Sequence, residues 1–586
     1  MTNSSFPGEP CNTPPRQEWT DIEKWAWQQL CEGKIADFNE KHQKKADPVE
    51  PGDWTDERVL SSNFLETVLL CDPYKSALPH EGIRIDGAWI KDQIDLSNAR
   101  LVHAFWLDNS RVENKSICRF LTTSEYLSFE KTLFLHGLDL SAAHIDRHVN
   151  MYGVKVQSEL DLNGLSVGGS LFISQSAELH DANLRGANIL GSLIMNGAKI
   201  HGKLDMNGIS VGCNIQLRDG ADLQEVDFTG SRVSGQLDMT GVMVHRKLSM
   251  NGISIGEHLF LDGPEAKFND VDMSMSRIDG TINIVDARFS GELYMESVVI
   301  GQHLIVAQST FQKKISLMFA AIGGNMTIYG TTLQVLDLTA ACIKGDIALG
   351  TIRENKLNWR EDSLLILRYA DVGSFQDAGS ENDVWPSELI LDGFTYKRLG
   401  GFSTKFPFGN MAYSALSQRN VDWFVHWLEK DKTFSVQPYQ QLAAVLQSTG
   451  NSGKAATVLY AAKQRERGEA FIAVNNDKWL GMCMLDWTIG YGFGYRYFRS
   501  LWWVAIFTLI GAYVLSTVGG NAAKLTYPES MAYSFNLLLP IVKLNEAYKI
   551  TKDFVGWQLY YFYVHQIIGY LLGLFIIAGL SGITKK

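Results

Sequence analysis

Arg147-His-Val-Asn-Met151 begins a pattern that returns along the chain. Similar blocks follow at Gly191-Ser-Leu-Ile-Met195, Gly235-Gln-Leu-Asp-Met239 and Gly280-Thr-Ile-Asn-Ile284. Their first residues are 44, 44 and 45 positions apart, and Gly324 lies a further 44 along. Fixed self-similarity of this kind is typical of a solenoid, in which each repeat buries its apolar residues against its neighbours.

The 44-residue period divides into two nearly equal halves. A second series of glycines falls between the block starts: Gly168, Gly212, Gly256 and Gly301. Along the chain, the distance from one start to the next alternates between 21 and 23 or 24 residues. Between the glycines lie short alternating runs such as Leu204-Asp-Met206, which ends at Asn207-Gly208. Alternating runs bounded by glycine are typical of strands and corners. About 22 residues per coil therefore predict a parallel β-helix.

Two stretches resemble a known repeat. Asp181-Ala-Asn-Leu-Arg-Gly-Ala-Asn-Ile189 and Val226-Asp-Phe-Thr-Gly-Ser-Arg-Val233 are similar to pentapeptide repeats. The resemblance implies a mainly β fold, a right-handed coil with four five-residue faces, and roughly a dozen coils within 81–400. A left-handed hexapeptide helix would need a step of 18 residues, so an acyltransferase of that type is not expected.

The totals limit the function. With 53 Lys and Arg against 64 Asp and Glu, the chain offers no excess of positive charge for nucleic acid. Seven scattered cysteines, without a Cys-x-x-Cys pair, favour reduced, buried thiols in a cytosolic compartment. Residues 1–17 are polar and read as a disordered lead rather than a signal peptide.

The flanks of the β-helix are predicted to be helical. Residues 18–80 form an N-terminal cap that would cover the open edge of the first coil. The first coils are expected near Gly82, with 103–131 looping out. Towards the other end, 354–386 is interpreted as an inserted loop and 388–393 as the last strand.

A helical adaptor is expected over 416–475. Within it, Gln437 to Ala461 resembles a single helix pair of the tetratricopeptide type. Arg465 and Arg467 are interpreted as a solvated or membrane-facing basic spot.

The composition becomes apolar within 476–586, which predicts a membrane module. Residues 501–518 and 558–583 carry no Asp, Glu, Lys or Arg. At about 1.5 Å per residue each nearly spans, or spans, a hydrocarbon core of about 30 Å. Tyrosines and tryptophans precede both segments, as at bilayer boundaries. An interfacial helix is expected before the first span.

The segment 528–545 lies between the two spans and is predicted to be re-entrant, because it is too short to cross and too apolar for an ordinary loop. Its Ala532-Tyr-Ser-Phe535 run resembles the pore helix of the two-span module of potassium-type channels. Leu539-Pro-Ile-Val-Lys543 stands where those channels have their filter, so selectivity for potassium is not implied. An interfacial hairpin is the alternative interpretation.

Polar and small residues in this module are the candidate sites. Polar side chains at membrane depth normally face a bundle interior or an aqueous path. The candidate pore residues are Asn536, Pro540, Lys543, Glu546, His565 and Gln566. Gly569 and Gly573 form a small-xxx-small face that predicts close helix packing or oligomerisation.

No catalytic, cofactor-binding or metal-ligating motif is found. Asp161, Asp205 and Asp238 recur between apolar neighbours at what are predicted to be equivalent positions, and they are interpreted as the solvated face of the coil. Asn163, Asn207 and Asn251 are interpreted as a corner ladder.

These features favour a membrane-anchored sensor or effector whose oligomerised membrane segments form a pore. The setting expected is a bacterial inner membrane, with the β-helix and both termini in the cytoplasm, in defence or stress. Expected partners are the lipid bilayer, further copies of the chain and a protein on the β-helix surface. The alternatives are a non-conducting scaffold and, third, a membrane-associated enzyme.

Overall fold

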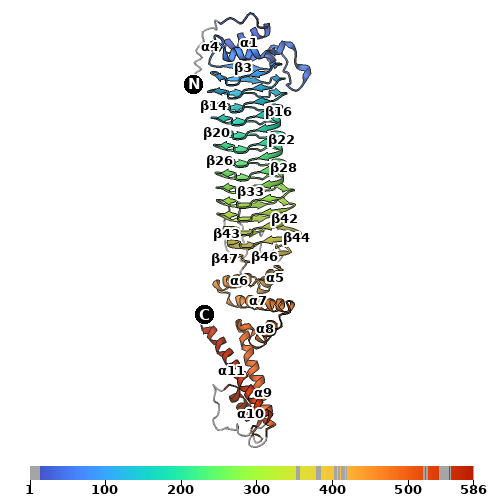
Figure 1. The fold of residues 1–586 in the computed structure, drawn as a ribbon, viewed down its shortest axis with the longest axis vertical. Helices are drawn as coiled ribbons and strands as arrows, with labels where there is room; N and C mark the ends of the chain where they lie inside the picture. The colour runs from blue at the N-terminus through green and yellow to red at the C-terminus, as the bar shows by residue number, and fades with distance from the viewer. Residues whose placement is uncertain are drawn as a thin grey trace. The chain divides into compact units, whose positions relative to one another are not determined.

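The computed structural model describes residues 13–350, 357–377, 385–400, 405–406, 409–410, 416, 419–518, 522, 525–539, 554 and 556–584. The chain forms two compact units, Met1–Gln418 and Arg419–Lys586, and each is described by itself. The first contains helices followed by a long stack of strands, and the described part of the second is helical (Figure 1).

The first unit begins with helix α1 (Asp21–Cys31). The Thr20 side chain accepts a hydrogen bond from the Glu23 backbone N–H, and the Glu23 side chain accepts one from the Thr20 N–H. This capping box satisfies two backbone donors that would otherwise have no partner. The remaining helices before the strands are short: α2 (Phe38–Lys41), η1 (Pro51–Asp53), η2 (Asp56–Arg58), α3 (Ser62–Leu70) and α4 (Tyr74–Ala77).

Two strands between these helices extend the first turn of the stack. β1 (Ala36–Asp37) pairs in parallel with β3 (Ile83–Asp86), and β2 (Val59–Leu60) pairs in parallel with β4 (Trp89–Ile90). Because an open sheet edge presents unpaired N–H and C=O groups, these pairings protect the first turn.

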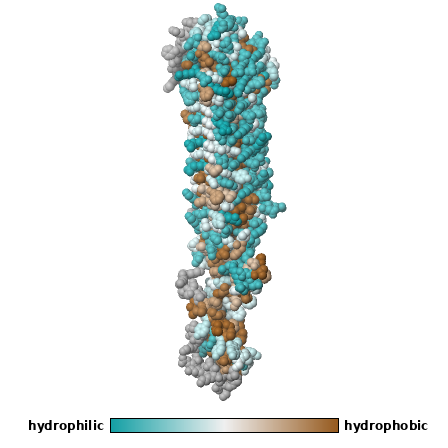
Figure 2. All heavy atoms as spheres, in the orientation of Figure 1, coloured by the Kyte–Doolittle hydropathy of each residue, from teal (hydrophilic) through white to brown (hydrophobic). Residues whose placement is uncertain are grey.

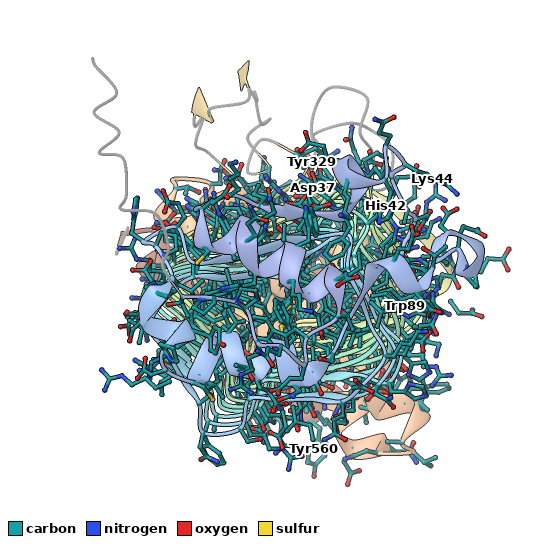
Figure 3. All side chains as sticks on the ribbon, turned by 90° about the horizontal axis from the view of Figure 1, so that it is seen from above. Asp37, His42, Lys44, Trp89, Tyr329 and Tyr560 are labelled. Carbon is teal, nitrogen blue, oxygen red and sulfur yellow. The ribbon has the colours of Figure 1, made fainter. Side chains whose placement is uncertain are left out.

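The stack is a parallel β-solenoid of about 14 turns with about 22 residues each, which confirms the predicted fold class. In a representative turn, β17 (Ser166–Val167), β18 (Leu171–Phe172) and β19 (Glu178–Asn183) make the faces, with β19 covering two of them. Each pairs in parallel with its equivalent one turn on: β20 (Asn188–Ile189), β21 (Leu193–Ile194) and β22 (Lys199–Asp205). Seen along the stack, the strands of successive turns superimpose and many side chains project outward (Figure 3).

The turns continue where the sequence predicted loops. Residues 103–131 form regular strands: β7 (Phe105–Asp108), β8 (Arg111–Val112), β9 (Ser116–Ile117), β10 (Thr122–Thr123) and β11 (Leu127–Ser128). The expected loop at 354–386 contains β44 (Asn358–Ile366) and β45 (Asp371–Asp377), and β46 (Glu388–Ile390) is followed by β47 (Thr395–Leu399). Both loop predictions are wrong, because polar or irregular residues on outward positions hid the strand pattern there.

Apolar residues stack in columns inside the solenoid. One such column is fully buried and in register from turn to turn: Leu171, Leu193, Ile215, Leu237 and Leu259. Each turn therefore buries its apolar side chains against the turns above and below, which is why the pattern in the sequence is periodic.

The periodic glycines have identifiable physical causes. At Gly212 a Cβ atom would overlap the carbonyl oxygen of Leu190 on the previous turn, and the same overlap occurs with Asp146 at Gly168. At Gly202 a Cβ would overlap the side chain of Asp181, which accepts a hydrogen bond from the Lys203 backbone N–H over 2.7 Å. Glycine recurs at these positions because neighbouring turns leave no room for a side chain.

The cysteines differ from the expectation of reduced, buried thiols. Cys31 is disulfide-bonded. Among the free thiols that the structure describes, Cys118 is buried, whereas Cys71, Cys213 and Cys342 are exposed.

The second unit contains the helices α5 (Val421–Glu429), α6 (Gln437–Ser448), α7 (Ser452–Ile472), α8 (Asn476–Ile489), η4 (Gly490–Gly492), η5 (Gly494–Phe498), α9 (Arg499–Ser516), α10 (Tyr527–Leu538) and α11 (Trp557–Thr584). Two segments, Gly494–Ser516 and Trp557–Ile577, are long and apolar enough to cross a membrane. Many residues on the visible face of this unit are hydrophobic, whereas hydrophilic residues dominate the visible face of the solenoid (Figure 2).

Helix α10 packs against both apolar helices. Tyr533 of α10 belongs to one buried cluster with Leu515 of α9 and Phe562 of α11. Leu538 belongs to a second cluster with Val504 of α9 and Leu572 of α11. With 12 residues, α10 is about 18 Å long and is too short to cross a hydrocarbon core of about 30 Å.

Candidate functional site

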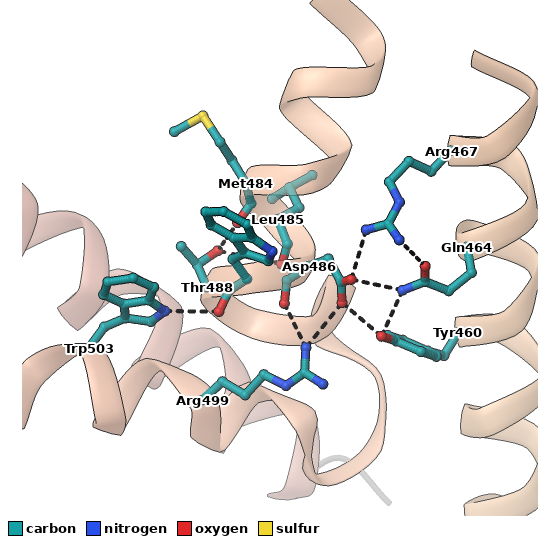
Figure 4. A network of polar contacts seen from close by, with 10 residues as sticks. Tyr460, Gln464, Arg467, Met484, Leu485, Asp486, Thr488, Arg499 and Trp503 are labelled. Carbon is teal, nitrogen blue, oxygen red and sulfur yellow. Dashed lines mark hydrogen bonds and ion pairs between the residues drawn. The ribbon is translucent and has the colours of Figure 1, made fainter. Parts of the chain in front are cut away.

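One buried carboxylate joins three helices of the second unit. Asp486 of α8 is 7% exposed. Three side chains of α7 donate hydrogen bonds to it: the Tyr460 hydroxyl and the Gln464 amide, each over 2.8 Å, and the Arg467 guanidinium over 2.9 Å. These residues lie at i, i+4 and i+7, which places them on one face of α7 (Figure 4).

The first residue of α9 completes this Asp486 cluster. Arg499 Nη1 donates to the Asp486 carboxylate over 3.1 Å and to its backbone carbonyl over 2.9 Å. Close by, the Trp503 indole N–H donates to the Trp487 carbonyl over 2.9 Å. The carboxylate therefore connects α7 and α8 to the helix that begins the first candidate span.

A glycine-rich turn follows α8 and contacts the cluster at Tyr460. Gly490 and Tyr491 both have positive φ values, 55° and 56°, which let the chain reverse between α8 and α9. The Tyr491 ring lies 5.8 Å from that of Tyr460, and the Arg496 guanidinium lies 3.9 Å from the Tyr460 ring centroid. Burial raises the pKa of Tyr491 to about 12, so this phenol is neutral at physiological pH.

The charges at Asp486 are balanced in favour of the ionised carboxylate. Desolvation by burial acts to raise its pKa, but hydrogen bonds from Gln464, Tyr460 and Arg467, together with the Arg467 charge, outweigh it. The pKa of Asp486 is therefore held below its usual range. At neutral pH the ionised carboxylate therefore holds α7, α8 and α9 together through charge-assisted hydrogen bonds.

The second polar cluster lies between α10 and α11. His565 is 1% exposed, and its Nε2 lies 3.2 Å from the Ser534 carbonyl oxygen. Its Nδ1 lies 3.2 Å from the Tyr561 hydroxyl. Because a carbonyl can only accept, we assign the proton to Nε2, which leaves Nδ1 to accept from Tyr561. The contact of Nε2 with the Ser534 carbonyl joins α11 to α10.

Two glycines allow α10 to approach its neighbours. A Cβ at Gly511 of α9 would overlap the Ser534 side-chain oxygen, and a Cβ at Gly569 of α11 would overlap the Leu538 carbonyl. At Gly573 a Cβ would make ordinary contact with Leu539, at 3.5 Å. The nearest neighbour of the predicted packing face is therefore α10 rather than the first span.

The other predicted pore residues have mixed placements. Asn536 lies on α10 and Gln566 on α11, both partly buried. Pro540, Lys543 and Glu546 lie outside the described residues.

The aspartates of the solenoid have a structural role. Asp161 and Asp205 are in register through Asn183 and accept the backbone N–H two residues ahead, over 3.1 Å each. Asp238 makes the same turn with Thr240, but its strand β27 (Leu237–Asp238) belongs to the other sheet. The prediction that these three aspartates occupy equivalent positions is therefore wrong for Asp238. Asp238 is also buried, at 7% exposed, so the interpretation that it belongs to the solvated face is wrong.

Sequence reasoning missed the Asp486 cluster and misread two of its neighbours. Arg467 donates to Asp486 and Gln464, and Arg465 donates to the backbone carbonyls of Leu428 and Asp431. The interpretation of these arginines as a solvated basic spot is wrong. One signal was available, since Asp486 is the sole charged residue between Lys478 and Arg496.

Within the residues that the structure describes, no group of three or more His, Cys, Asp or Glu side chains is arranged to hold a metal ion. No protein-family model, curated protein or solved structure matches this chain.

Proposed function

We propose that this chain is a membrane-anchored sensor or effector, in which α9, α10 and α11 of several copies form a pore that changes membrane permeability. Two spans in one chain cannot enclose a water-filled path, so the pore requires assembly of copies. The solenoid would receive the signal, through a partner or through further copies of the chain.

The observation that carries the proposal is the polar contact between His565 and Ser534. It is buried within three helices that are otherwise joined by apolar clusters. A polar pair costs free energy to place in an apolar environment and is a functional candidate by default at membrane depth. It also fixes α10, a helix too short to cross, against α11. A short helix held between two spans is the arrangement that a re-entrant pore helix requires.

The Asp486 cluster supplies a mechanical connection for the same proposal. Helix α7 contributes three of its contacts and α9 contributes Arg499. A displacement of α7 would therefore pull on the beginning of the first span. We infer that the adaptor helices transmit the signal to the membrane segments along this path.

The experiment is induced expression of the full chain followed by a membrane-potential dye. The proposal expects depolarisation with the unaltered chain. His565→Phe removes both polar contacts and should change the depolarisation at equal membrane content. His565→Gln keeps an amide that can donate to the Ser534 carbonyl and should be closer to the unaltered chain. Tyr570→Phe, at an exposed position of the same helix, is the matched control.

An intact membrane potential, with the chain shown to be inserted at high level, would contradict the pore and favour the non-conducting scaffold. Equal depolarisation by the unaltered chain, His565→Phe and Tyr570→Phe would keep a pore but remove His565 from it.

The proposal includes a bacterial inner membrane, with the solenoid and both termini on the cytoplasmic side. The exposed thiols of Cys213 and Cys342 would remain reduced there. The disulfide at Cys31 counts against this orientation, since disulfides are rare in the cytosol. A membrane-impermeant maleimide decides the matter: labelling of either thiol in intact spheroplasts would place the solenoid on the opposite side.

A further inference from the structure

One corner of the solenoid carries apolar side chains where the backbone favours glycine. A single residue per turn has positive φ at this corner. Five successive turns use glycine there: Gly164, Gly186, Gly208, Gly230 and Gly252. The next five turns instead use Met275, Ser297, Phe319, Ala340 and Tyr369, with φ between 55° and 58°. We call this set of five residues the apolar corner.

The backbone hydrogen bonds show that these residues belong to adjacent turns. The Met275 N–H donates to the Glu296 carbonyl over 2.8 Å, and the Phe319 N–H donates to the Thr339 carbonyl over 2.8 Å. The Tyr369 N–H continues the series to Asp392 over 2.9 Å. The apolar corner is therefore a continuous column along one edge of the unit.

Its three large side chains are exposed to solvent. Met275 is 67% exposed, Phe319 61% and Tyr369 62%. A side chain at positive φ strains the backbone, and an apolar side chain left mostly in water recovers little through burial. Single exposed apolar residues are normal, but a column of them at strained positions is not.

The opposite corner shows that positive φ does not demand apolar residues. It has the same backbone conformation, with φ between 51° and 58°, at Lys131, Gln175, Asp219, Asp286 and Gln308. All five are polar. Earlier turns carry Asn98, Phe120 and Ala142 at the first corner, and Ser297 interrupts its later turns. The two corners therefore differ in their large side chains, which are apolar on the later turns of the first corner and polar at the opposite corner.

We propose that the apolar corner is the surface on which a second copy of this chain docks. The inference rests on the proposed function, which requires copies to assemble, and it names where they meet. Large and small residues alternate along the column, and neighbouring turns are about 4.8 Å apart. Met275, Phe319 and Tyr369 are thus spaced by about 10 Å, with Ser297 and Ala340 between them. Copies anchored in one bilayer hold equivalent residues at equal heights, so the large side chains of the two copies would pack against each other in three layers.

The area of the corner fits pairing between anchored copies. If a large side chain offers about 200 Å², three that are some 60% exposed provide about 350 Å² on each copy. Two copies would bury about 700 Å², below the 1,200–2,000 Å² of interfaces that are stable in solution. Confinement to one bilayer raises the effective concentration of the copies, which compensates for a small interface.

Two native thiols allow a direct test in membranes containing the full chain. Cys342 is exposed and lies two residues after Ala340, beside the apolar corner, whereas Cys213 is exposed at a different edge and serves as the control. With Cys71 and Cys483 replaced by alanine, a short bismaleimide should give a band at twice the mass of the chain. The Cys342→Ala variant should lose this band, and the Cys213→Ala variant should keep it.

Substitutions at the corner then test the surface itself. Phe319→Gly keeps the backbone conformation while removing the central side chain, and Phe319→Asp adds a charge. Both should lower the Cys342 cross-link at least fivefold. Gln308→Asp, at the equivalent position of the opposite corner, should leave the cross-link unchanged.

Three results would overturn the inference: no cross-link through Cys342, an equal cross-link through Cys213, or a Cys342 product of another mass, which would indicate a different partner. The proposed pore is judged separately. Depolarisation that persists in Phe319→Gly without a cross-link would retain the pore and reject this surface. A cross-link without depolarisation in the unaltered chain would do the reverse.

Discussion

Asp108 and Asp486 are partly or largely buried carboxylates, one in each unit, and their pKa values move in opposite directions. Asp108 of the solenoid accepts hydrogen bonds from the Ser128 hydroxyl over 2.7 Å and the Glu130 backbone over 2.8 Å. Burial raises its pKa to about 6, and the negative charges of Glu130 and Asp86 act in the same direction. Asp486 has two arginines, and its pKa is lowered.

The difference lies in where the partners come from. Asp108 is held by neutral groups of the next turn, so its contacts repeat the turn-to-turn bonding of the whole solenoid. Asp486 is held by cations from two other helices, and nothing in the described part of the second unit repeats this arrangement. A carboxylate whose contacts follow the repeat therefore has a structural role within the solenoid. A charged contact that occurs once, like that of Asp486, instead connects separate helices.

The largest loss of stability is expected from removing the Asp486 carboxylate. Asp486→Ala leaves Arg467 and Arg499 without their carboxylate, and removing one partner of a buried ion pair costs about 3 kcal/mol or more. The thermal unfolding midpoint in detergent should fall by about 5–10 °C if the 168 residues of the second unit unfold together. Asp477→Asn, at an exposed position of the same helix, should change it by less than about 1 °C. An unchanged midpoint in Asp486→Ala would mean that the carboxylate does not hold α7, α8 and α9 together.

A smaller, pH-dependent effect is expected at Asp108. Its folded-state pKa of about 6 lies above the ordinary aspartate pKa of 3.8, so the folded state binds more protons than the unfolded state between these pH values. Stability is therefore lost as the pH rises from about 4 to about 6. Asp108→Asn removes this loss and should gain about 2–3 kcal/mol relative to the unaltered chain at pH 7.5, but little at pH 4.5.

Chemical denaturation at the two pH values measures this difference. Asp219→Asn is the control, because Asp219 is exposed and has a positive φ that asparagine also adopts. A gain of equal size at both pH values would show that Asp108 is not the titrating group.

Two neighbouring glycines of the solenoid distinguish the two reasons for a glycine, namely lack of space for a side chain and a positive φ. Gly212 has no positive φ, but a Cβ there would overlap the Leu190 carbonyl; Gly208 has φ +69° and nothing within 4 Å of the added atom. We expect Gly212→Ala to cost about 2–3 kcal/mol, because the backbone itself must move, and Gly208→Ala to cost about 1 kcal/mol. Denaturant midpoints at equal slope measure both. A larger loss of stability in Gly208→Ala than in Gly212→Ala would mean that neighbouring turns move apart at little cost.

The solenoid was predictable because its physics is local and repeated. A glycine at the same corner of each turn and an apolar residue in each column appear in the sequence at a fixed period, so the 22-residue coil follows from Gly168, Gly191, Gly212 and their equivalents. The Asp486 cluster was not predictable in the same way. Its members are spread from Tyr460 to Arg499, belong to three helices and occur once. His565 was found because a polar residue inside an apolar run is visible without its partner, whereas Ser534 required the structure.

The smallest effect concerns the apolar corner and tests the strain on which its interpretation depends. Met275→Gly relieves a side chain at positive φ, worth about 1–2 kcal/mol, while the more flexible unfolded chain offsets about 0.5–1 kcal/mol of it. The variant should therefore be more stable by about 0.5–1 kcal/mol in denaturation of the detergent-solubilised chain. Leu190→Gly is the matched control, because Leu190 is similarly exposed, at 61%, without positive φ, and it should lose about that amount. Equal losses in both variants would mean that Met275 carries no strain. The apolar corner would then differ from the opposite corner only in the polarity of its side chains. A gain in Met275→Gly alone, together with a weaker Cys342 cross-link, would show that the chain gives up stability at this position in order to present the side chain to another copy.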